Sequence, residues 1–346
     1  MASIKDISER CGVSVATVSK ALNGKKDISN DTREMVLKTA EEMNYYPNPN
    51  AKTLRTKHSN MIGIILTGED FCGLCDEFFS HMFLSIKNSC EELGYELQFI
   101  NKKVGSQSMT YLQRCKFKNI DGVILAYVQY QEPQIQELLN SDIPVITVDN
   151  RMDKRSTVCF DYTEGIQSLV HYIYQLGHRR IAYIHGEDKE HSNTQDRLRS
   201  FYCTTDKLGI KVPDAYVREG RYIDARLCRK LTEELLKLPE PPTCIMYPND
   251  YSAIAGIGEI NRLGMSVPED VSVVGYDGIT IANVVWPELT TYAQNVEMMG
   301  RRIVEQLVKL IEEQKKETVV RLNVTGTLVN GASVKDLNRS INHSGG

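Results

Sequence analysis

The chain has 346 residues, of which 25% are charged and 41% hydrophobic, so its composition excludes the disordered and fibrous classes of protein. Because a single hydrophobic core stops growing at roughly 250–300 residues, we expect two or three domains. No apolar run approaches the roughly 18 residues that a membrane-spanning helix needs, and no signal-type apolar stretch begins the chain. We therefore expect a cytoplasmic protein without a membrane partner.

The net charge of −4 is divided unevenly along the chain. Residues 1–60 contain ten basic and seven acidic side chains, a net charge of +3, which leaves −7 for the remainder. Such asymmetry is expected when a small domain contacts phosphate and the larger part of the chain does not. Charge alone is a weak indication of DNA binding, and the pattern of expected helices is the stronger one.

The nine cysteines are an odd number, and they are scattered through segments that we expect to be core helices and strands. This distribution is typical of reduced, buried thiols and not of a disulfide framework. Only one Cys-x-x-Cys occurs, formed by Cys72 and Cys75, and no second pair completes a zinc pattern. The sequence therefore predicts no metal site.

Two short helices with a tight turn are expected near the amino terminus. A Ser-x-x-acid capping signal at Ser3 precedes a helix over residues 4–11, and Gly12 ends it. Ser14 can cap a second helix over residues 15–22. Two helices joined in this way are typical of a helix-turn-helix, whose second helix presents small side chains to base edges in the major groove.

An ordinary helical hairpin is the alternative interpretation, and a third helix argues against it. Ser29 or Asn30 can cap a helix over residues 31–44. Its apolar stripe consists of Met35, Val36, Thr39, Ala40 and Met43. Three helices in about 45 residues form a minimal DNA-reading unit, so we expect a headpiece of this kind.

Residues 47–60 have the composition of a stiffened linker that contains a conditional helix. Pro47 and Pro49 restrict the backbone, and Pro49 suits a first helical turn. Only residues 50–56 remain to be helical, too few for a stable helix in water. We expect this hinge helix to fold on DNA, and a passive linker is the alternative.

From Met61 onward, short apolar runs alternate with amphipathic helical stretches. The runs read as strands buried on both faces of a parallel sheet, namely MIGIIL, ELQFI, DGVILAYV, PVITVD, IAYIHG, CIMYP and VSVVGYD. Their number exceeds one modest sheet, so the pattern predicts a doubly wound α/β body with two lobes.

Short polar side chains follow several of these expected strands, namely Asp149, Asn249, Asp250 and Asp277. Ligands of doubly wound sheets bind outside the carboxyl ends of the strands. Each residue could instead cap a helix, because Asn and Asp are frequent there. Together with Arg197, expected at the start of a helix, they predict a polar ring suited to hydroxyl groups.

Two runs, IKDISERCGVSVATVSKALNG and ISNDTREMVLKTAEEMNYYPN, resemble the headpiece of the lactose/galactose repressor (LacI/GalR) family, and YPNPNAKTLRT resembles its hinge helix. The resemblance continues to about Val334 through LGHRRIAYIHG, VPEDVSVVGYD and TGTLVNGAS. It implies a periplasmic-binding-protein-like body with three crossovers between lobes. The expected domains are a headpiece (1–46), a hinge (47–60), an effector-binding and dimerisation domain (61–334) and a polar tail (335–346).

The resemblance also assigns residues, position by position. The DNA-binding residues it implies are Ser14, Val15, Ala16, Thr17, Ser19, Lys20, Asn23, Asn48, Ala51, Leu54 and Arg55. Val15, Ala16 and Lys20 would be the base readers, and Leu54 would be the minor-groove wedge. Lys20 replaces the arginine more often found there and lacks its bidentate fork. The effector-binding residues it implies are Asp149, Phe160, Arg197, Tyr222, Asn249, Asp277 and Gln294. Phe71 and Trp286 are further candidates for the wall, with burial in the core as the alternative for each.

The resulting prediction is a homodimeric transcription regulator that binds operator DNA and a sugar or sugar derivative. We expect it to be a repressor. No dinucleotide-binding glycine motif, nucleophile elbow or phosphate-binding loop occurs, so we expect neither an enzyme nor a cofactor. Two alternatives remain. One is a redox-sensing regulator that acts through Cys72 and Cys75, and the other is a solute receptor without operator function.

Overall fold

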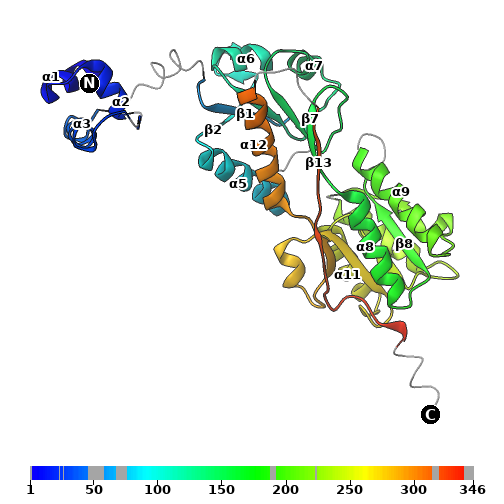
Figure 1. Cartoon of the computed structure of the whole chain (residues 1–346). Helices are drawn as coiled ribbons and strands as arrows, with labels where there is room; N and C mark the ends of the chain where they lie inside the picture. Colours follow the sequence, from blue (N-terminus) through cyan, green and yellow to red (C-terminus); the bar gives the residue numbers. More distant parts are fainter. Residues whose placement is uncertain are drawn as a thin grey trace. The chain divides into compact units, whose positions relative to one another are not determined.

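The computed structural model describes residues 2–22, 24–25, 27–45, 58–67, 76–187, 192–222, 224–313 and 319–338. The chain forms two compact units, Met1–Ser59 and Asn60–Gly346 (Figure 1). Several predictions fall outside the described residues, namely those for Asn23, the hinge helix with Asn48, Ala51, Leu54 and Arg55, Phe71, Cys72 and Cys75. In the part of the chain that is described, no helix is both long and apolar enough to span a membrane.

The described residues of the first unit form three helices, and local capping explains where they begin. They are α1 (Ile4–Cys11), α2 (Val15–Leu22) and α3 (Asn30–Glu42). The Ser3 hydroxyl accepts from the Asp6 amide at 3.3 Å, and the Asp6 carboxylate accepts from the Ser3 amide at 2.8 Å, a complete capping box. Gly12 ends α1 with φ 66°, a backbone conformation that costs glycine little.

A small hydrophobic core holds these three helices together. It consists of Ile7, Val18, Ala21, Val36 and Ala40. The prediction that Met35 belongs to the apolar stripe of the third helix is wrong, because its side chain is 40% exposed. Val36 and Ala40, one turn apart, are the buried residues of α3 and contribute its part of this core.

Two six-stranded sheets form the second unit, each in its own lobe. The first sheet runs, in spatial order, β13 (Arg321–Val324), β7 (Ser156–Phe160), β6 (Val145–Val148), β5 (Gly122–Leu125), β1 (Met61–Ile65) and β2 (Glu96–Phe99), all parallel. Helices α5 (Glu77–Glu92) and α12 (Val296–Glu313) pack together on one face, and α6 (Tyr111–Phe117) and α7 (Pro133–Leu139) on the other (Figure 1). A hairpin of β3 (Lys103–Val104) and β4 (Gln107–Ser108) precedes α6.

The second sheet repeats the same winding. Its order is β14 (Thr327–Val329), β12 (Thr290–Ala293), β11 (Ser272–Asp277), β10 (Cys244–Met246), β8 (Ile181–His185) and β9 (Val217–Glu219), with only β14 antiparallel. The helices of this lobe are α8 (Tyr162–Gln175), α9 (Ser192–Lys207), α10 (Ala225–Leu236) and α11 (Asp250–Arg262). Two 3₁₀ helices, η1 (Asp214–Tyr216) and η2 (Thr280–Asn283), complete it.

The chain crosses between the lobes three times, after β7, after β12 and after β13. In each sheet the first five strands follow the doubly wound order 2-1-3-4-5, so the carboxyl ends of the central strands lie at one edge. The predicted fold, with its helix-turn-helix headpiece and two-lobed body, is confirmed.

Two details of the sequence prediction are wrong. The run ELQFI was expected to be buried on both faces, but β2 is an edge strand and both Glu96 and Phe99 are exposed. Hydrophobic content alone does not tell an edge strand from a central one. The expectation that the cysteines are buried fails for Cys203, which is exposed on α9, whereas five others are buried: Cys90, Cys115, Cys159, Cys228 and Cys244.

Candidate DNA-reading helix and effector site

The amino-terminal half of α2 offers a polar, sterically small surface. The Ser14 hydroxyl caps the helix by accepting from the Thr17 amide at 3.0 Å. Val18 faces the core of the headpiece and is fully buried. The predicted DNA-binding residues of α2 lie on the remaining surface: Ser14, Val15, Ala16 and Lys20 are exposed, and Thr17 and Ser19 are partly buried. This arrangement leaves the helix backbone accessible to a groove.

Lys20, one of the three predicted base readers, forms an ion pair within the headpiece. Its Nζ lies 2.6 Å from Oδ2 of Asp27, and both side chains are more than half exposed. The hydrogen bond from Lys20 holds the pKa of the Asp27 carboxyl below its ordinary value. The ammonium group is therefore positioned by a partner before any ligand is present.

In the second unit, predicted effector residues lie at the carboxyl ends of strands of both sheets. Asp149 follows β6, Phe160 ends β7, Asp277 ends β11 and Gln294 follows β12. Asp149 and Asp277 have φ values of 54° and 104°, which side-chain-bearing residues rarely adopt. Such backbone conformations are concentrated at functional sites, where the surrounding structure maintains them.

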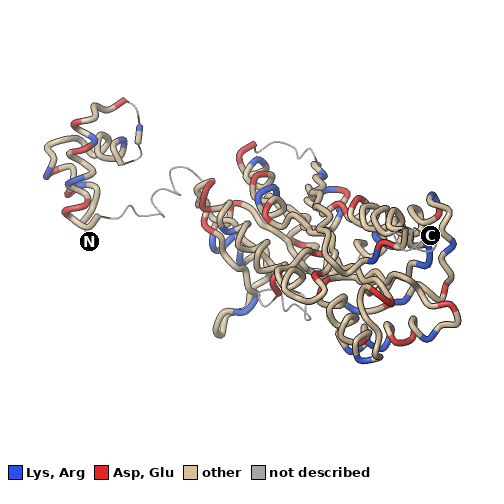
Figure 2. The backbone as a smooth tube through the Cα atoms, turned by 90° about the horizontal axis from the view of Figure 1, so that it is seen from below, with Lys and Arg blue, Asp and Glu red and all other residues tan. Residues whose placement is uncertain are grey.

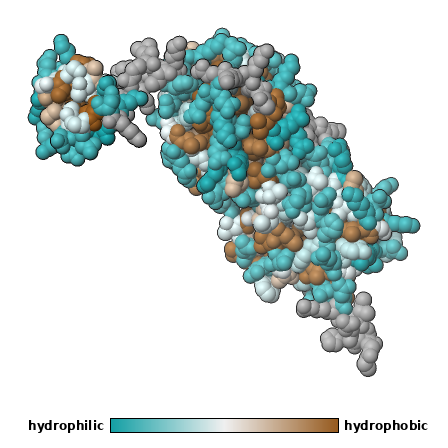
Figure 3. Space-filling model, viewed as in Figure 1, coloured by the Kyte–Doolittle hydropathy of each residue, from teal (hydrophilic) through white to brown (hydrophobic). Residues whose placement is uncertain are grey.

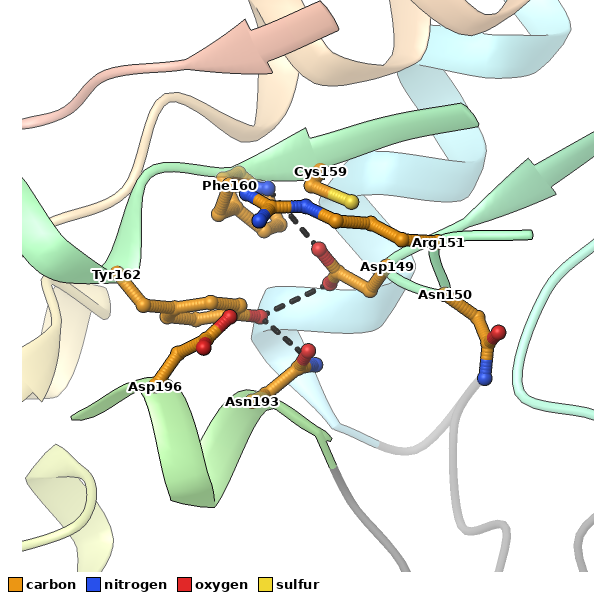
Figure 4. Close-up of a pocket in the computed structure, with 8 residues that line it drawn as sticks. All are labelled: Asp149, Asn150, Arg151, Cys159, Phe160, Tyr162, Asn193 and Asp196. Carbon is orange, nitrogen blue, oxygen red and sulfur yellow. Dashed lines mark hydrogen bonds between the residues drawn. The ribbon is translucent and has the colours of Figure 1, made fainter. Parts of the chain in front are cut away.

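A pocket of about 110 Å³ lies around Asp149 (Figure 4). The Asp149 carboxylate accepts from the Phe160 amide at 2.9 Å and from the Tyr162 hydroxyl at 2.9 Å. The Asn193 amide nitrogen lies 3.3 Å from the same hydroxyl and brings α9 into the wall. The full lining is Asp149, Asn150, Arg151, Cys159, Phe160, Tyr162, Asn193 and Asp196, so residues of both lobes contribute to it.

Arg197 occupies an aromatic box behind this pocket. Its Cζ lies 3.9 Å from the ring centre of Tyr276, 4.5 Å from that of Tyr162 and 5.8 Å from that of Tyr222. One terminal nitrogen donates to the Pro248 carbonyl at 2.8 Å, and the buried Nε has no hydrogen-bond partner. Cation–π contacts with these rings thus stabilise the buried guanidinium group. Arg197 lies within α9, not at its start as predicted.

The side-chain amide of Asn249 forms hydrogen bonds within the fold through both its oxygen and its nitrogen. Its Oδ1 caps α11 by accepting from the Ser252 amide at 2.9 Å, and its Nδ2 donates to the Tyr222 carbonyl at 2.7 Å. The Tyr222 hydroxyl in turn lies 3.0 Å from the Thr194 hydroxyl. The helix-cap interpretation therefore accounts for Asn249, and through this amide the residue positions Tyr222.

The side-chain carboxylate of Asp250 also forms hydrogen bonds within the fold. Its carboxylate accepts from the Gly278 amide at 2.7 Å, the Ile279 amide at 2.9 Å and the Thr291 hydroxyl at 2.6 Å. These bonds fix the backbone that follows β11. Asp250 therefore supports the end of the strand that carries Asp277 and does not itself face the pocket.

Burial controls the charge of the acidic groups in this region. It raises the pKa of Asp149 to about 6 and that of Asp277 to about 8, although hydrogen bonds and Arg197 oppose the shift. Asp277 also accepts from Nε2 of Gln294 at 2.8 Å, while Oε1 of Gln294 is buried without a hydrogen-bond partner. The pKa of Asp277 therefore lies above that of Asp149, so Asp277 takes up its proton first as the pH falls.

Sequence reasoning identified the strand-end residues but missed much of the aromatic box. Of the predicted effector residues, Asp149 and Phe160 line the pocket, and Arg197 contacts it through Tyr162. The prediction that Trp286 forms part of the wall is wrong, because its side chain is 82% exposed. The lining residues that were missed are Asn150, Arg151, Cys159, Tyr162, Asn193 and Asp196, and the ring of Tyr276 beside Arg197 was missed as well. A tyrosine beside a strand-end acid was the available signal for Tyr276.

Two family models match the chain. Residues 3–48 match the bacterial regulatory proteins of the lacI family, and residues 170–334 match the periplasmic binding protein-like domain. The chain is 29% identical over 341 residues to the HTH-type transcriptional repressor PurR of Erwinia tasmaniensis, covering 97% of this chain and 98% of that protein. With the PurR of Pasteurella multocida it shares 28% identity over 324 residues, which cover 92% and 95%.

Solved structures agree along nearly the whole chain. A lac repressor dimer bound to operator and the anti-inducer ONPF superimposes with a TM-score of 0.77 at 25% identity, covering 96% of this chain and 99% of that one. The fold is also that of a complex of the regulator CelR with cellobiose, at a TM-score of 0.67, 24% identity and coverages of 96% and 100%. The chain belongs to the lactose/galactose repressor (LacI/GalR) family, whose members are transcription regulators and not enzymes.

Proposed function

We propose that this protein is a homodimeric repressor that binds a pseudo-palindromic operator and is controlled by a small molecule bound between its lobes. The observation that carries the proposal is the exposed amino-terminal half of α2, held on a headpiece with its own core. Two such helices related by a two-fold axis match two half-sites of a duplex. The lac repressor structure, a dimer on its operator, supports the same arrangement.

The division of labour follows the sequence. Residues 1–46 would bind the major groove, residues 47–60 would form the hinge, residues 61–334 would bind the effector and dimerise, and residues 335–346 would form a polar tail. Operator binding would place the protein in the cytoplasm. Coupling between effector and operator would have a free energy of about 1–3 kcal/mol, the usual range for allosteric proteins.

A sugar or sugar derivative is our proposed effector. The mixture of aromatic rings, amides and carboxyl groups around Arg197 fits a ligand with both flat apolar faces and hydroxyl groups. The pocket of about 110 Å³ is smaller than the roughly 300–1,000 Å³ of most ligand pockets. Binding would therefore require side chains or lobes to move, and such a movement is what an allosteric switch needs.

Two measurements test the proposal on the full-length protein. Selection from a randomised duplex library should enrich a sequence with two symmetry-related halves, and binding should weaken steeply with salt. Thermal-shift screening against sugars, sugar phosphates and nucleobases should identify a ligand, since one at 100 times its Kd adds about 2.7 kcal/mol to stability. If the duplex pool yields no enriched sequence, operator function is excluded. Stabilisation by nucleobases alone would replace the sugar assignment.

A further inference from the structure

The ion pair between Lys20 and Asp27 lies where the headpiece is expected to meet DNA. Asp27 is the only acidic residue between Ser14 and Asn30, a segment that also contains Lys20, Lys25 and Lys26. Acidic and basic residues are interspersed over the first unit as a whole (Figure 2), so the headpiece does not bind by a uniform positive surface. An acid beside the base-reading lysine repels phosphate and needs a reason to be there.

A contribution to folding stability does not explain why an acid stands beside Lys20. The side chains of Lys20 and Asp27 are 51% and 59% exposed, and exposed ion pairs contribute little to folding. The pair joins α2 to the turn before α3 without burying either charge. A comparable exposed pair, Arg10 with Glu42 at 3.1 Å, already connects α1 to α3. The role of Asp27 therefore lies at the surface that is expected to face DNA.

We infer that Asp27 determines base specificity by holding the Lys20 ammonium group at the base edges and by accepting a hydrogen bond itself. This inference rests on the proposed operator function. A free lysine has three donors on a flexible stem and binds phosphate or any acceptor in the groove. Asp27 engages one of these donors at 2.6 Å and restricts the direction of the others.

The paired side chains present donors and an acceptor side by side. Guanine offers N7 and O6 as acceptors to lysine, and cytosine offers its N4 amino group to a carboxylate. Lys20 would read guanine and Asp27 would read a cytosine amino group, so the pair requires G·C content where lysine alone would tolerate other acceptors. An arginine fork has donors in fixed directions, which a single lysine lacks. The pairing of Lys20 with Asp27 supplies that directionality.

Full-length wild type, D27A, K20A, the double variant and E42A are compared in selection from a randomised duplex library. E42A is the matched control, because it removes one acid from an equally exposed ion pair elsewhere in the headpiece. We expect wild type and E42A to require cytosine at one position in each half-site. In D27A this preference should fall by about tenfold or more, the usual worth of one specific base contact.

Fluorescence anisotropy on a scrambled duplex provides the second readout. D27A should bind it more tightly than wild type, and the salt dependence should steepen by about one phosphate per headpiece, because Lys20 is freed. The double variant should show no such steepening relative to K20A. An unchanged base preference in D27A overturns the inference, as does an equal loss of affinity for all duplexes. Failure of wild type itself to enrich any sequence overturns the proposed function together with it.

Discussion

Buried carboxyl groups at the strand ends should make this protein less stable as the pH rises. The pKa is raised to about 6 for Asp149, about 7 for Asp250 and about 8 for Asp277, in each case by burial. The folded state therefore binds more protons than the unfolded state between about pH 4 and pH 8. Stability from these groups is fully present below their unfolded pKa and is lost as the pH passes through the folded values.

Replacing Asp277 by asparagine tests this directly. D277N removes the cost of ionising a buried acid, so its free energy of unfolding should exceed that of wild type by on the order of 1–3 kcal/mol at pH 9. The advantage should shrink towards pH 5, where both side chains are neutral. Urea denaturation across this pH range measures it. D206N, at an exposed position of α9, should follow wild type. A constant difference at every pH would refute the assignment.

The guanidinium of Arg197 should not be replaceable by an ammonium group. Lysine keeps the charge but cannot stack as a plane on Tyr162 and Tyr276, and a buried ammonium is costly to desolvate. We expect R197K to lower the free energy of unfolding by about 1–3 kcal/mol and to abolish the thermal shift caused by the effector. R199K, on the exposed side of the same helix, should change neither. Normal effector response in R197K would disprove the role of stacking.

At the scale of elements, local chemistry explains what could be predicted. Helices α1 and α2 were placed correctly because capping residues and glycine act within a few positions of the helix ends. Strand β7 was missed, because its residues Ser156–Phe160 form no long apolar run. Its burial comes from pairing with β6 and with β13, which lies over 150 residues further along the chain. No local pattern records such a partner.

A contact between the lobes outside the pocket was equally invisible to sequence reasoning. Glu77, the first residue of α5, accepts from the Thr280 amide of η2 at 2.7 Å. E77A should remove this bond and expose the Thr280 amide more often, so the amides of η2 should exchange hydrogen for deuterium faster. E91A, which removes an exposed acid paired with Lys87 in the same helix, is the control. Equal exchange in both variants would show that Glu77 does not hold the lobes.

At the scale of the whole second unit, two lobes could be predicted from the number of strands, and the location of the site from the rule for strand ends. Which side chains remain available to a ligand could not. Asn249, Asp250 and Asp149 have the same signature and all three bond within the fold, yet of the three only Asp149 lines the pocket. The partners of Asn249 and Asp250 are Tyr222, Gly278 and Thr291, which come from other segments of the second lobe, so no local pattern records them.

The surface of this unit carries an apolar face that a second copy of the chain would cover. Ile281, Val284 and Trp286 are 41%, 75% and 82% exposed within one short segment that begins in η2. On the first lobe, Leu84 of α5 is 53% exposed and Met298 of α12 is 37% exposed, and the Ser85 hydroxyl donates to the Glu297 carbonyl at 2.6 Å. In the view of Figure 3, hydrophobic side chains lie at the surface of both lobes. Exposed patches of this kind mark interfaces in soluble proteins.

Trp286 should be the energetic centre of the proposed dimer, because large aromatic side chains dominate interface energies. We expect W286A to shift the full-length protein from dimer to monomer at micromolar concentration, measured by analytical ultracentrifugation. Operator affinity should fall with it, since one headpiece loses the avidity of two. F117A removes an aromatic side chain that is 65% exposed on α6, on the opposite face of the first sheet, and should leave the dimer intact. If W286A remains dimeric, the two copies meet through another surface.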